Sequence, residues 1–361
     1  MKNKNHYVAI MAGGVGSRFW PMSKSSFPKQ FLDILNTGKT LIQSTYDRFS
    51  NFIPEENIYI VTSKEYVGIV QQQLPNLPLE NIIAEPERKN TAACVAYFSF
   101  KLKKMNPKAN FIVAPSDHLI GDLDLFEETC LKALDFTEKH EAFVTLGIQP
   151  NHPNTGYGYI QKGEKNEAEN VFQVKRFTEK PDRDTAKKFL MSGEYFWNSG
   201  IFIWKAEDII QAFWEHARHF YDLFHEAMPA IGTPEEEKSI EKIYSECRSI
   251  SIDYAIMEKA KNVYVIPSYF QWNDLGTWNS AWENFSKDES QNACNSKSTI
   301  LVDSKGCLVH SNEEKLMVIG GLDDLIIVNT PEALLICKKE NEQQIKEYVA
   351  KVKEIKGELY I

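Results

Sequence analysis

The sequence predicts an α/β fold with a mostly parallel sheet, followed by a small β appendage at the C-terminal end. Two observations indicate this organisation: short apolar runs alternate with helical patterns before residue 151, and the composition changes after residue 285. Alternating strands and helices are typical of βαβ units, because each crossover helix has to cover a face of the sheet. We therefore expect a large domain of residues 1–285 and an appendage of residues 286–361.

The large domain begins with regularly alternating elements. Strands are expected at its short apolar runs, over 7–12, 57–63, 81–86, 110–118 and 142–150. Helices are expected where apolar residues recur at helical spacing, over 40–49, 64–74, 90–105 and 126–139. In such sheets ligands bind at the carboxyl ends of the strands, so the charged residues that follow each strand are the candidates for chemistry.

After residue 150 the pattern changes to strands joined by turns. These strands are expected over 156–162, 171–181 and 198–206. Two helices then follow over 207–228 and 234–246, and a further strand over 262–274. The second helix starts with Thr233-Pro234-Glu235-Glu236, which has the pattern of a capping box with proline in the first turn.

The appendage begins with the polar, linker-like segment 286–298. Apolar runs separated by glycines or acidic turns come next, over 299–303, 315–321, 325–330 and 333–339, and a helical tail over 341–357 closes the chain. Such short apolar runs predict a small β unit. We expect this unit to serve packing or association rather than catalysis.

Length and composition exclude several classes of protein. With 361 residues and 43% hydrophobic residues, the chain is long and apolar enough for a globular core. Its net charge of −9 provides no basic field, so no nucleic-acid partner is expected. The sequence has neither a secretory leader pattern nor a run of roughly 20 apolar residues, so no membrane partner is expected. The six cysteines are scattered without a C-x-x-C pair, which is typical of reduced thiols in a cytoplasmic protein.

The segment GGVGSRFWPMSKSSFPKQ, residues 13–30, follows the first expected strand. It lacks the third glycine of a dinucleotide fingerprint, and no G-x-x-x-x-G-K-[ST] follows, so neither a Rossmann dehydrogenase nor a P-loop NTPase is expected. Glycines let backbone N–H groups approach an anion, and Arg18 and Lys29 can neutralise its charge. A structural turn with two surface cations is the alternative that this loop alone leaves open.

The order of glycines, Arg18, Pro28 and Lys29 in this loop resembles the nucleotidyltransferases that activate sugar phosphates. Further segments, in the same order along nearly the whole chain, are similar to those of the mannose-1-phosphate guanylyltransferases. These segments are 85–92, 115–118, 155–160, 177–181, 197–200 and 272–276. One departure is Lys89, where many members have arginine. The charge is kept but the bidentate fork is lost, so Lys89 is given no role.

The resemblance implies a Rossmann-like nucleotidyltransferase fold with a mostly parallel mixed sheet and a β-helix-like appendage. It implies transfer of GMP from GTP to α-D-mannose 1-phosphate, with Mg²⁺ as cofactor and a homodimer as a possible assembly. Because some members carry an additional isomerase domain that the appendage is too short to hold, a single activity is expected. Another NTP or sugar phosphate is the alternative among enzymes, and a non-catalytic nucleotide-sugar sensor is the alternative outside them.

The residues that the resemblance assigns to the nucleotide follow the first strands of the sheet. Guanine presents two adjacent donors, N1–H and the 2-amino group, which one carboxylate can accept, and Glu85 is the implied acceptor. Asn90 and Thr91 would hold the nucleoside, although Asn90 could also simply cap its helix. Arg18 and Lys29 would bind the triphosphate and stabilise the leaving pyrophosphate. The other implied nucleotide-binding residues are Gly13, Gly14, Gly16 and Ser116.

The sugar side is implied by later segments. Glu179 and Asn198 would hydrogen-bond the sugar hydroxyls, and Gly158 would let the backbone approach the ring. Lys180 is the implied catalytic clamp on the sugar phosphate. Asp253 matches a segment that lines the sugar side, where a helix cap is an equally open interpretation.

The implied metal ligands are Asp117 and Asp274, each of which follows an expected strand. Mg²⁺ is commonly bound by one or two carboxylates together with substrate phosphates. A carboxylate after a strand could instead cap the next helix, and the resemblance favours metal binding for this pair.

Overall fold

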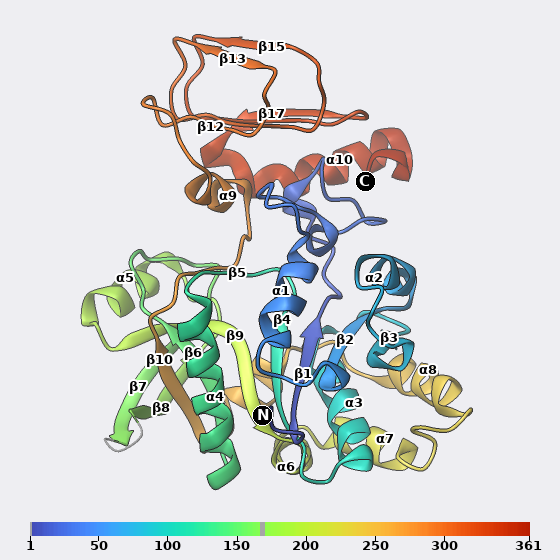
Figure 1. Ribbon diagram of the computed structural model, residues 1–361. Helices are drawn as coiled ribbons and strands as arrows, with labels where there is room; N and C mark the ends of the chain where they lie inside the picture. Colours follow the sequence, from blue (N-terminus) through green and yellow to red (C-terminus); the bar gives the residue numbers. More distant parts are fainter. Residues whose placement is uncertain (1, 167–169) are drawn as a thin grey trace. The chain divides into compact units, whose positions relative to one another are not determined.

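The computed structural model describes residues 2–166 and 170–361, which form two compact units (Figure 1). The first unit contains the chain up to Gly13, Tyr46–Ser116 and Ile120–Trp272. The second unit contains Gly14–Thr45, Asp117–Leu119 and Asn273–Ile361. The chain passes from one unit to the other inside β5 (Leu119–Ile120) and inside β11 (Trp272–Asn273). The predicted boundary between residues 285 and 286 falls within the second unit.

The first unit is built on a mixed sheet with nine strands among the described residues, in the order β3-β2-β1-β4-β9-β6-β10-β8-β7 (Figure 1). Strands β3, β2, β1 and β4 are parallel, as is β10 to β6. Strand β9 is antiparallel to β4 and β6, and β8 is antiparallel to β10 and β7. The α/β prediction is confirmed. The strands are β1 (His6–Met11), β2 (Ile58–Ser63), β3 (Ile82–Glu85), β4 (Asn110–Pro115), β6 (Phe143–Ile148), β7 (Tyr159–Asn166), β8 (Val171–Thr178), β9 (Tyr195–Lys205) and β10 (Val263–Ser268).

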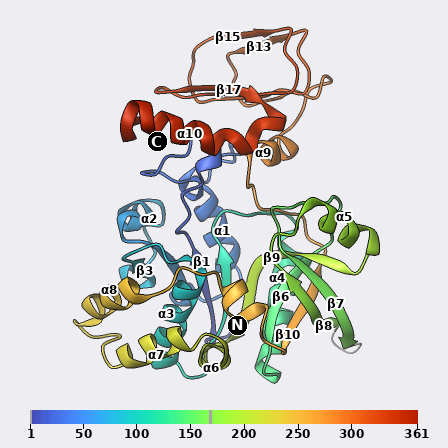
Figure 2. The same ribbon diagram turned by 180° about the vertical axis from the view of Figure 1, so that it is seen from behind.

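Helices cover both faces of this sheet, as the two opposite views show (Figures 1 and 2). On β4, the Asn110 side chain donates to the carbonyl of Leu134 in α4 at 2.9 Å. The next residue, Phe111, packs against Phe98 of α3 with ring centroids 5.2 Å apart. Because successive strand residues point to opposite faces, α3 and α4 lie on opposite sides. The helices are α1 (Leu41–Ser50), α2 (Val67–Gln73), α3 (Asn90–Met105), α4 (Leu123–Lys139), α5 (Arg183–Ser192), α6 (Ala206–His216), α7 (Arg218–Ala227) and α8 (Glu236–Glu246).

Two details of the predicted helices are wrong. The helix predicted over 207–228 is two helices, α6 and α7, because Ala217 has non-helical backbone angles. This break turns α7, so that Phe220 packs on Phe213 and Phe224 on Phe100. The predicted capping box at Thr233 does not form, and α8 begins without a side-chain cap. Its Glu236 carboxylate accepts hydrogen bonds from Tyr97 and Lys101 on α3, and its Oε2 accepts the N–H of Gly232 at 2.7 Å rather than that of Thr233.

The second unit joins the glycine loop to the C-terminal part of the chain. Phe19 and Trp20 share a hydrophobic core with Trp278, Leu308 and Ile345. Short strands form two small sheets, β12-β14-β16-β17 and β13-β15. Among the described strands of these two sheets, only β17 is antiparallel to its neighbour. This is the predicted β-helix-like appendage with its helical tail. Its elements are α9 (Trp278–Asn284), β12 (Ala293–Cys294), β13 (Thr299–Val302), β14 (Leu308–Ser311), β15 (Met317–Gly320), β16 (Leu325–Asn329), β17 (Leu334–Lys338) and α10 (Ile345–Lys356).

Two predictions drawn from composition can be compared with this fold. All six cysteines are free thiols, and four of them are buried, in agreement with the expected absence of a disulfide framework. Across residues 2–166 and 170–361, no helix combines the length and the apolar character needed to cross a bilayer.

Candidate active site

A cavity of about 260 Å³ in the second unit brings together residues from four separate parts of the chain. It contains the predicted cations Arg18 and Lys29 and the predicted metal ligands Asp117 and Asp274. The fold therefore places the predicted cations and the predicted carboxylates around one space. The lining residues are Gly16, Ser17, Arg18, Phe19, Lys29, Asp117, His118, Asp274, Gly276 and Lys346.

Lys29 lies at the centre of this arrangement and is buried. Its Nζ lies 2.8 Å from Asp117 Oδ2. It also donates to the carbonyl oxygens of Asp274 and Leu275 at 3.0 and 2.8 Å. An ammonium group has three N–H donors, so these contacts account for all of them. In this structure, Lys29 thus links the glycine loop to both carboxylate-bearing segments.

Gly16 is the position in the loop where only glycine fits. Its φ of 64° lies in the left-handed region, which side chains other than glycine rarely adopt. A Cβ at this position would lie 2.4 Å from Cβ of Lys29. The loop is further fixed by Gln30, whose Nε2 donates to the carbonyl oxygen of Gly14 at 2.9 Å. Gly16 is therefore required for the buried position of Lys29.

The two carboxylates fit a bound Mg²⁺. Burial on its own would raise the pKa of Asp117, but the Lys29 ammonium and His118 together lower it below its usual range. Asp274 is held by its Oδ1, which accepts the Gly276 N–H at 2.9 Å. No group of three acidic, histidine or cysteine side chains in the described chain is arranged to hold a metal. A two-carboxylate site suits Mg²⁺, because this ion completes its shell with phosphate oxygens and water.

In the first unit, Glu85 ends strand β3 and is held by a residue that the motifs did not indicate. Tyr244 of α8 is buried, and its hydroxyl donates to Glu85 Oε1 at 2.8 Å. Gly13 lies nearby, because a Cβ built on it would be 3.6 Å from Glu85 Oε2. Burial raises the pKa of Glu85 to about 7, and the Tyr244 hydrogen bond partly opposes this rise.

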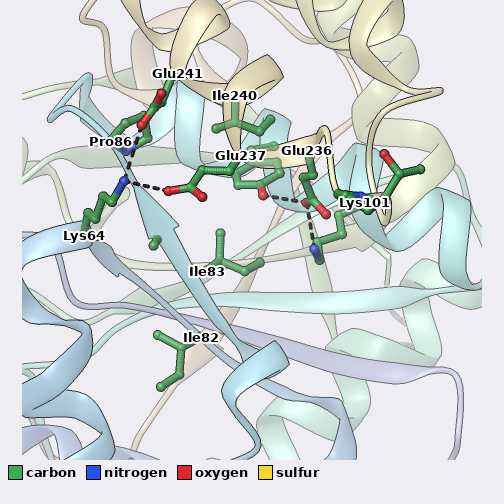
Figure 3. A pocket seen from close by; sticks show the side chains of 13 residues that line it. Lys64, Ile82, Ile83, Pro86, Lys101, Glu236, Glu237, Ile240 and Glu241 are labelled. Carbon is green, nitrogen blue, oxygen red and sulfur yellow. Dashed lines mark hydrogen bonds and ion pairs between the residues drawn. The ribbon is translucent and has the colours of Figure 1, made fainter.

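A second cavity, of about 320 Å³, lies along β3 and shows how α8 is held beside that strand (Figure 3). Lys64 pairs with Glu237 at 2.6 Å and Glu241 at 3.4 Å. Lys101 pairs with Glu236 at 2.7 Å. The three carboxylates outnumber the two lysines, so this cavity is not suited to a phosphate. Its ion pairs fix the helix that carries Tyr244.

The other predicted nucleotide residues of the first unit make contacts within the fold. Asn90 has a φ of 64°, and its Oδ1 accepts the N–H of Thr91 at 2.8 Å. The alternative of an Asn90 cap is wrong, because Lys89 occupies the N-cap position and no side chain caps the helix. Thr91 Oγ1 accepts the N–H of Ile252 at 2.8 Å. Ser116 is buried, and its N–H donates to the carbonyl of Met11 at 3.1 Å.

Three of the predicted sugar residues lie together in the first unit: Gly158 precedes β7, Glu179 follows β8, and Asn198 lies within β9. The N–H of Asn198 donates to the carbonyl of Gly158 at 2.9 Å. A Cβ on Gly158 would lie 2.6 Å from Glu179 Oε2 and 3.3 Å from Cβ of Asn198. A side chain at position 158 would therefore displace the Glu179 carboxylate and crowd Asn198, so the backbone is accessible here because this residue is glycine.

Asp253 and Lys180 complete this group. Asn198 Nδ2 donates to Asp253 Oδ1 at 3.0 Å, and Lys180 forms an ion pair with Glu179. Burial and the nearby Glu179 charge raise the pKa of Asp253 to about 6. The structure thus joins five residues from four separate segments in one polar cluster, which we call the sugar cluster: Gly158, Glu179, Lys180, Asn198 and Asp253.

Two residues of these sites, Tyr244 and Lys346, are not indicated by any sequence motif. Tyr244 follows Ile240 and Ile243 at helical spacing, a pattern that indicates only a core-facing helix. Lys346 lines the cavity that holds Asp117 and Asp274, but it lies in a tail whose lysines recur without any motif. Neither residue carries a sequence signal that distinguishes it from its neighbours.

Comparisons with known proteins show the family to which the chain is related. The family described as "Nucleotidyl transferase" matches residues 7–291, and the domain described as "MannoseP isomerase/GMP-like beta-helix domain" matches residues 297–352. Alginate biosynthesis protein AlgA of Pseudomonas aeruginosa is 37% identical over 348 residues, which are 94% of this chain and 70% of that protein. Mannose-1-phosphate guanylyltransferase of Klebsiella pneumoniae is 35% identical over 96% of this chain and 73% of that protein.

A solved structure supports the same relationship along the whole chain. It is described as mannose-1-phosphate geranyltransferase from Thermus thermophilus, and its sequence is 27% identical. It matches with a TM-score of 0.86 and covers 97% of this chain and 99% of that one. The fold is therefore shared over both units.

Proposed function

The chain belongs to the nucleotidyl transferase family, in the group of the mannose-1-phosphate guanylyltransferases, and we propose that it transfers GMP from GTP to α-D-mannose 1-phosphate. The products are GDP-mannose and pyrophosphate. The observation that carries this proposal is the cavity that gathers Arg18, Lys29, Asp117 and Asp274. A structural turn with surface cations would not bury Lys29 between two carboxylate-bearing segments.

The reaction needs positioned charges rather than a side-chain nucleophile. The monoester of mannose 1-phosphate is largely dianionic at neutral pH, because its second pKa is near 6. One of its oxygens attacks the α-phosphorus of GTP while the bond from that phosphorus to the bridging β-phosphate oxygen breaks, and pyrophosphate leaves. Positioning and charge neutralisation dominate such transfers.

The charged residues of the cavity divide this work. Arg18 binds the phosphates that leave, and Lys29 holds Asp117 and the Asp274 segment in place. Asp117 and Asp274 would hold a Mg²⁺, which would neutralise charge on the phosphates. On the sugar side, Lys180 binds the phosphate of mannose 1-phosphate, and the rest of the sugar cluster binds its hydroxyls.

Glu85 is the proposed guanine acceptor. Its two carboxylate oxygens can accept N1–H and the 2-amino group, while the Tyr244 hydroxyl occupies a further lone pair of Oε1. Adenine and the pyrimidines do not offer this pair of adjacent donors. Glu85 thereby favours GTP over the alternative nucleotides.

The reaction itself is tested by following purified protein with ³¹P NMR in the presence of Mg²⁺, GTP and mannose 1-phosphate. Equal amounts of GDP-mannose and pyrophosphate are expected. Binding of GDP-mannose without turnover would favour the alternative of a non-catalytic sensor, which needs no pair of metal carboxylates. The cytoplasmic location and the homodimer stay predictions. The single activity also stays a prediction, because the chain spans only 70% and 73% of the length of the two relatives above.

Glu85→Gln is expected to lower kcat/KM for GTP by roughly 10- to 100-fold, because an amide cannot accept both guanine donors and loses a charged hydrogen bond. The kcat/KM for UTP should change less than about threefold, so the preference for guanine collapses. Glu87→Gln is the matched control, because Glu87 is exposed two residues further along and should stay close to the wild type. An unchanged preference in Glu85→Gln would remove Glu85 from guanine recognition.

The affinity for GDP-mannose is expected to rise between about pH 6 and pH 8. Glu85, whose pKa is raised to about 7, is protonated below this range and then accepts fewer donors. GDP-mannose is the right probe, because its diester phosphates have no ionisation near pH 6. Isothermal titration calorimetry should show this rise in affinity for the wild type, and the pH midpoint of the rise should be higher in Tyr244→Phe. In Glu85→Gln only a smaller change in affinity near pH 6, from Asp253, should remain. The same rise in Glu85→Gln would contradict the assignment.

A further inference from the structure

Helix α10, in the C-terminal tail (red in Figure 1), carries a lysine that lines the cavity of Asp117 and Asp274. The helix contacts the turn Ser17–Phe19 of the glycine loop. Its second residue, Lys346, lines the same cavity as Arg18, Asp117 and Asp274. All of these residues belong to the second unit, so the cavity is defined within one compact part of the chain.

The cations of this cavity differ in how many of their hydrogen-bond donors already have a protein acceptor. Lys29 has its three donors directed to protein oxygens. Lys346 is exposed, and it forms no hydrogen bond or ion pair with any residue in 2–166 or 170–361. Arg18 carries a buried Nε without a hydrogen-bond partner among the same residues. A buried donor that lacks a partner is costly unless a ligand supplies an acceptor.

The charges of Arg18 and Lys346 also act on each other. The positive charge of Arg18, followed by burial, lowers the pKa of Lys346. Burial raises the pKa of Glu342, and the charge of nearby Arg18 partly opposes this rise. The Oε2 of Glu342 accepts the N–H of Asn279 at 2.9 Å. Two cations that repel each other beside a cavity are stabilised by an anion that binds between them.

We propose that Lys346 is a phosphate-binding residue of this cavity and acts beside Arg18 on the pyrophosphate part of the nucleotide. The inference rests on the proposed function, and it extends the triphosphate site to the C-terminal helix. Lys29 then has the different role of positioning Asp117 and the Asp274 segment. The tail is therefore part of the nucleotide site as well as of the packed core.

The test is calorimetric binding of pyrophosphate, with and without Mg²⁺, to wild type, Lys346→Met and Lys351→Met. Loss of one charge-assisted hydrogen bond is expected to weaken binding by about tenfold or more in Lys346→Met. Lys351 is exposed on the same helix, so Lys351→Met is the matched control and should bind as the wild type does. Lys346→Arg should retain most of the affinity. Equal affinity in Lys346→Met and Lys351→Met would overturn the proposal, as would a wild type that does not bind pyrophosphate.

The reverse reaction separates a phosphate contact from a general disturbance. In Lys346→Met the KM for pyrophosphate should rise by about tenfold, while the KM for GDP-mannose should stay within about twofold. A parallel rise of both KM values would contradict a local contact. Pyrophosphate binding does not depend on which base or sugar is used, so loss of binding in Lys346→Met would support this inference even if GDP-mannose were not the product.

Discussion

Asp274→Asn is expected to abolish Mg²⁺-dependent formation of GDP-mannose, with kcat lowered by roughly 10³-fold or more. The amide keeps an oxygen that can accept the Gly276 N–H, as Asp274 Oδ1 does at 2.9 Å, so the turn should be preserved. What is lost is the negative charge that we propose to hold the metal. Steady-state kinetics with increasing Mg²⁺ measure the effect.

The matched control for this change is Asp303→Asn, which removes an exposed carboxylate from the same unit. This control should show wild-type activity, and both variants should melt within about 2 °C of the wild type. Near-normal turnover of Asp274→Asn at low Mg²⁺ would remove Asp274 from the metal site. Partial recovery at high Mg²⁺ would agree with a weakened but otherwise intact site.

Lys29→Met is expected to lower kcat by roughly 10²-fold or more and also to destabilise the fold. The substitution removes the cation that lies 2.8 Å from Asp117, together with the donors to the carbonyls of Asp274 and Leu275. Loss of these hydrogen bonds in a buried position should lower the free energy of unfolding by about 2–3 kcal/mol. Urea unfolding and steady-state kinetics measure the two effects separately.

Lys24→Met provides the comparison for this prediction. Lys24 lies in the same loop and pairs with Glu332, and a pair near the surface contributes little, about 1 kcal/mol or less. Its activity should therefore stay near that of the wild type. A Lys29→Met protein with normal stability and a raised KM for GTP alone would instead indicate a direct phosphate contact and contradict the positioning role.

The ion pair between Lys29 and Asp117 should also change how the stability of the protein depends on pH. In the wild type the pKa of Asp117 is held below its usual range by Lys29 and His118, against the effect of burial. A depressed carboxyl pKa adds stability above the unfolded pKa of about 3.9, and this contribution is lost as the pH falls through the folded pKa. In Lys29→Met the pKa of Asp117 should rise, so the variant should lose stability at a higher pH than the wild type does.

Much of the fold could be predicted from the sequence because periodicity reports burial directly. The strand ending at Glu85 and the helix beginning at Asn90 were both predicted close to their observed bounds. The direction of β9 could not be predicted, because a buried strand has the same apolar pattern in either direction. The break at Ala217 involves neither proline nor glycine, and it depends on how α7 packs on α3.

The site was predictable where motifs carry it and unpredictable where tertiary contacts decide. The five residues of the sugar cluster come from four separate segments and lie together. The connecting role of Lys29 could not be inferred, because its three oxygen partners come from segments far apart in the chain. Tyr244 and Lys346 reach their sites only through the placement of α8 and α10, which the patterns of those helices do not encode.

The preference among nucleotides and sugar phosphates is the most direct test of the proposed transfer of GMP to mannose 1-phosphate. Pyrophosphate release by the purified wild type should be measured for each NTP with each sugar 1-phosphate, with and without EDTA. We predict that GTP with mannose 1-phosphate gives the highest kcat/KM and that EDTA abolishes it. Faster use of UTP than of GTP, or turnover that persists in EDTA, would contradict the assignment of Glu85 to guanine or of Asp117 and Asp274 to the metal.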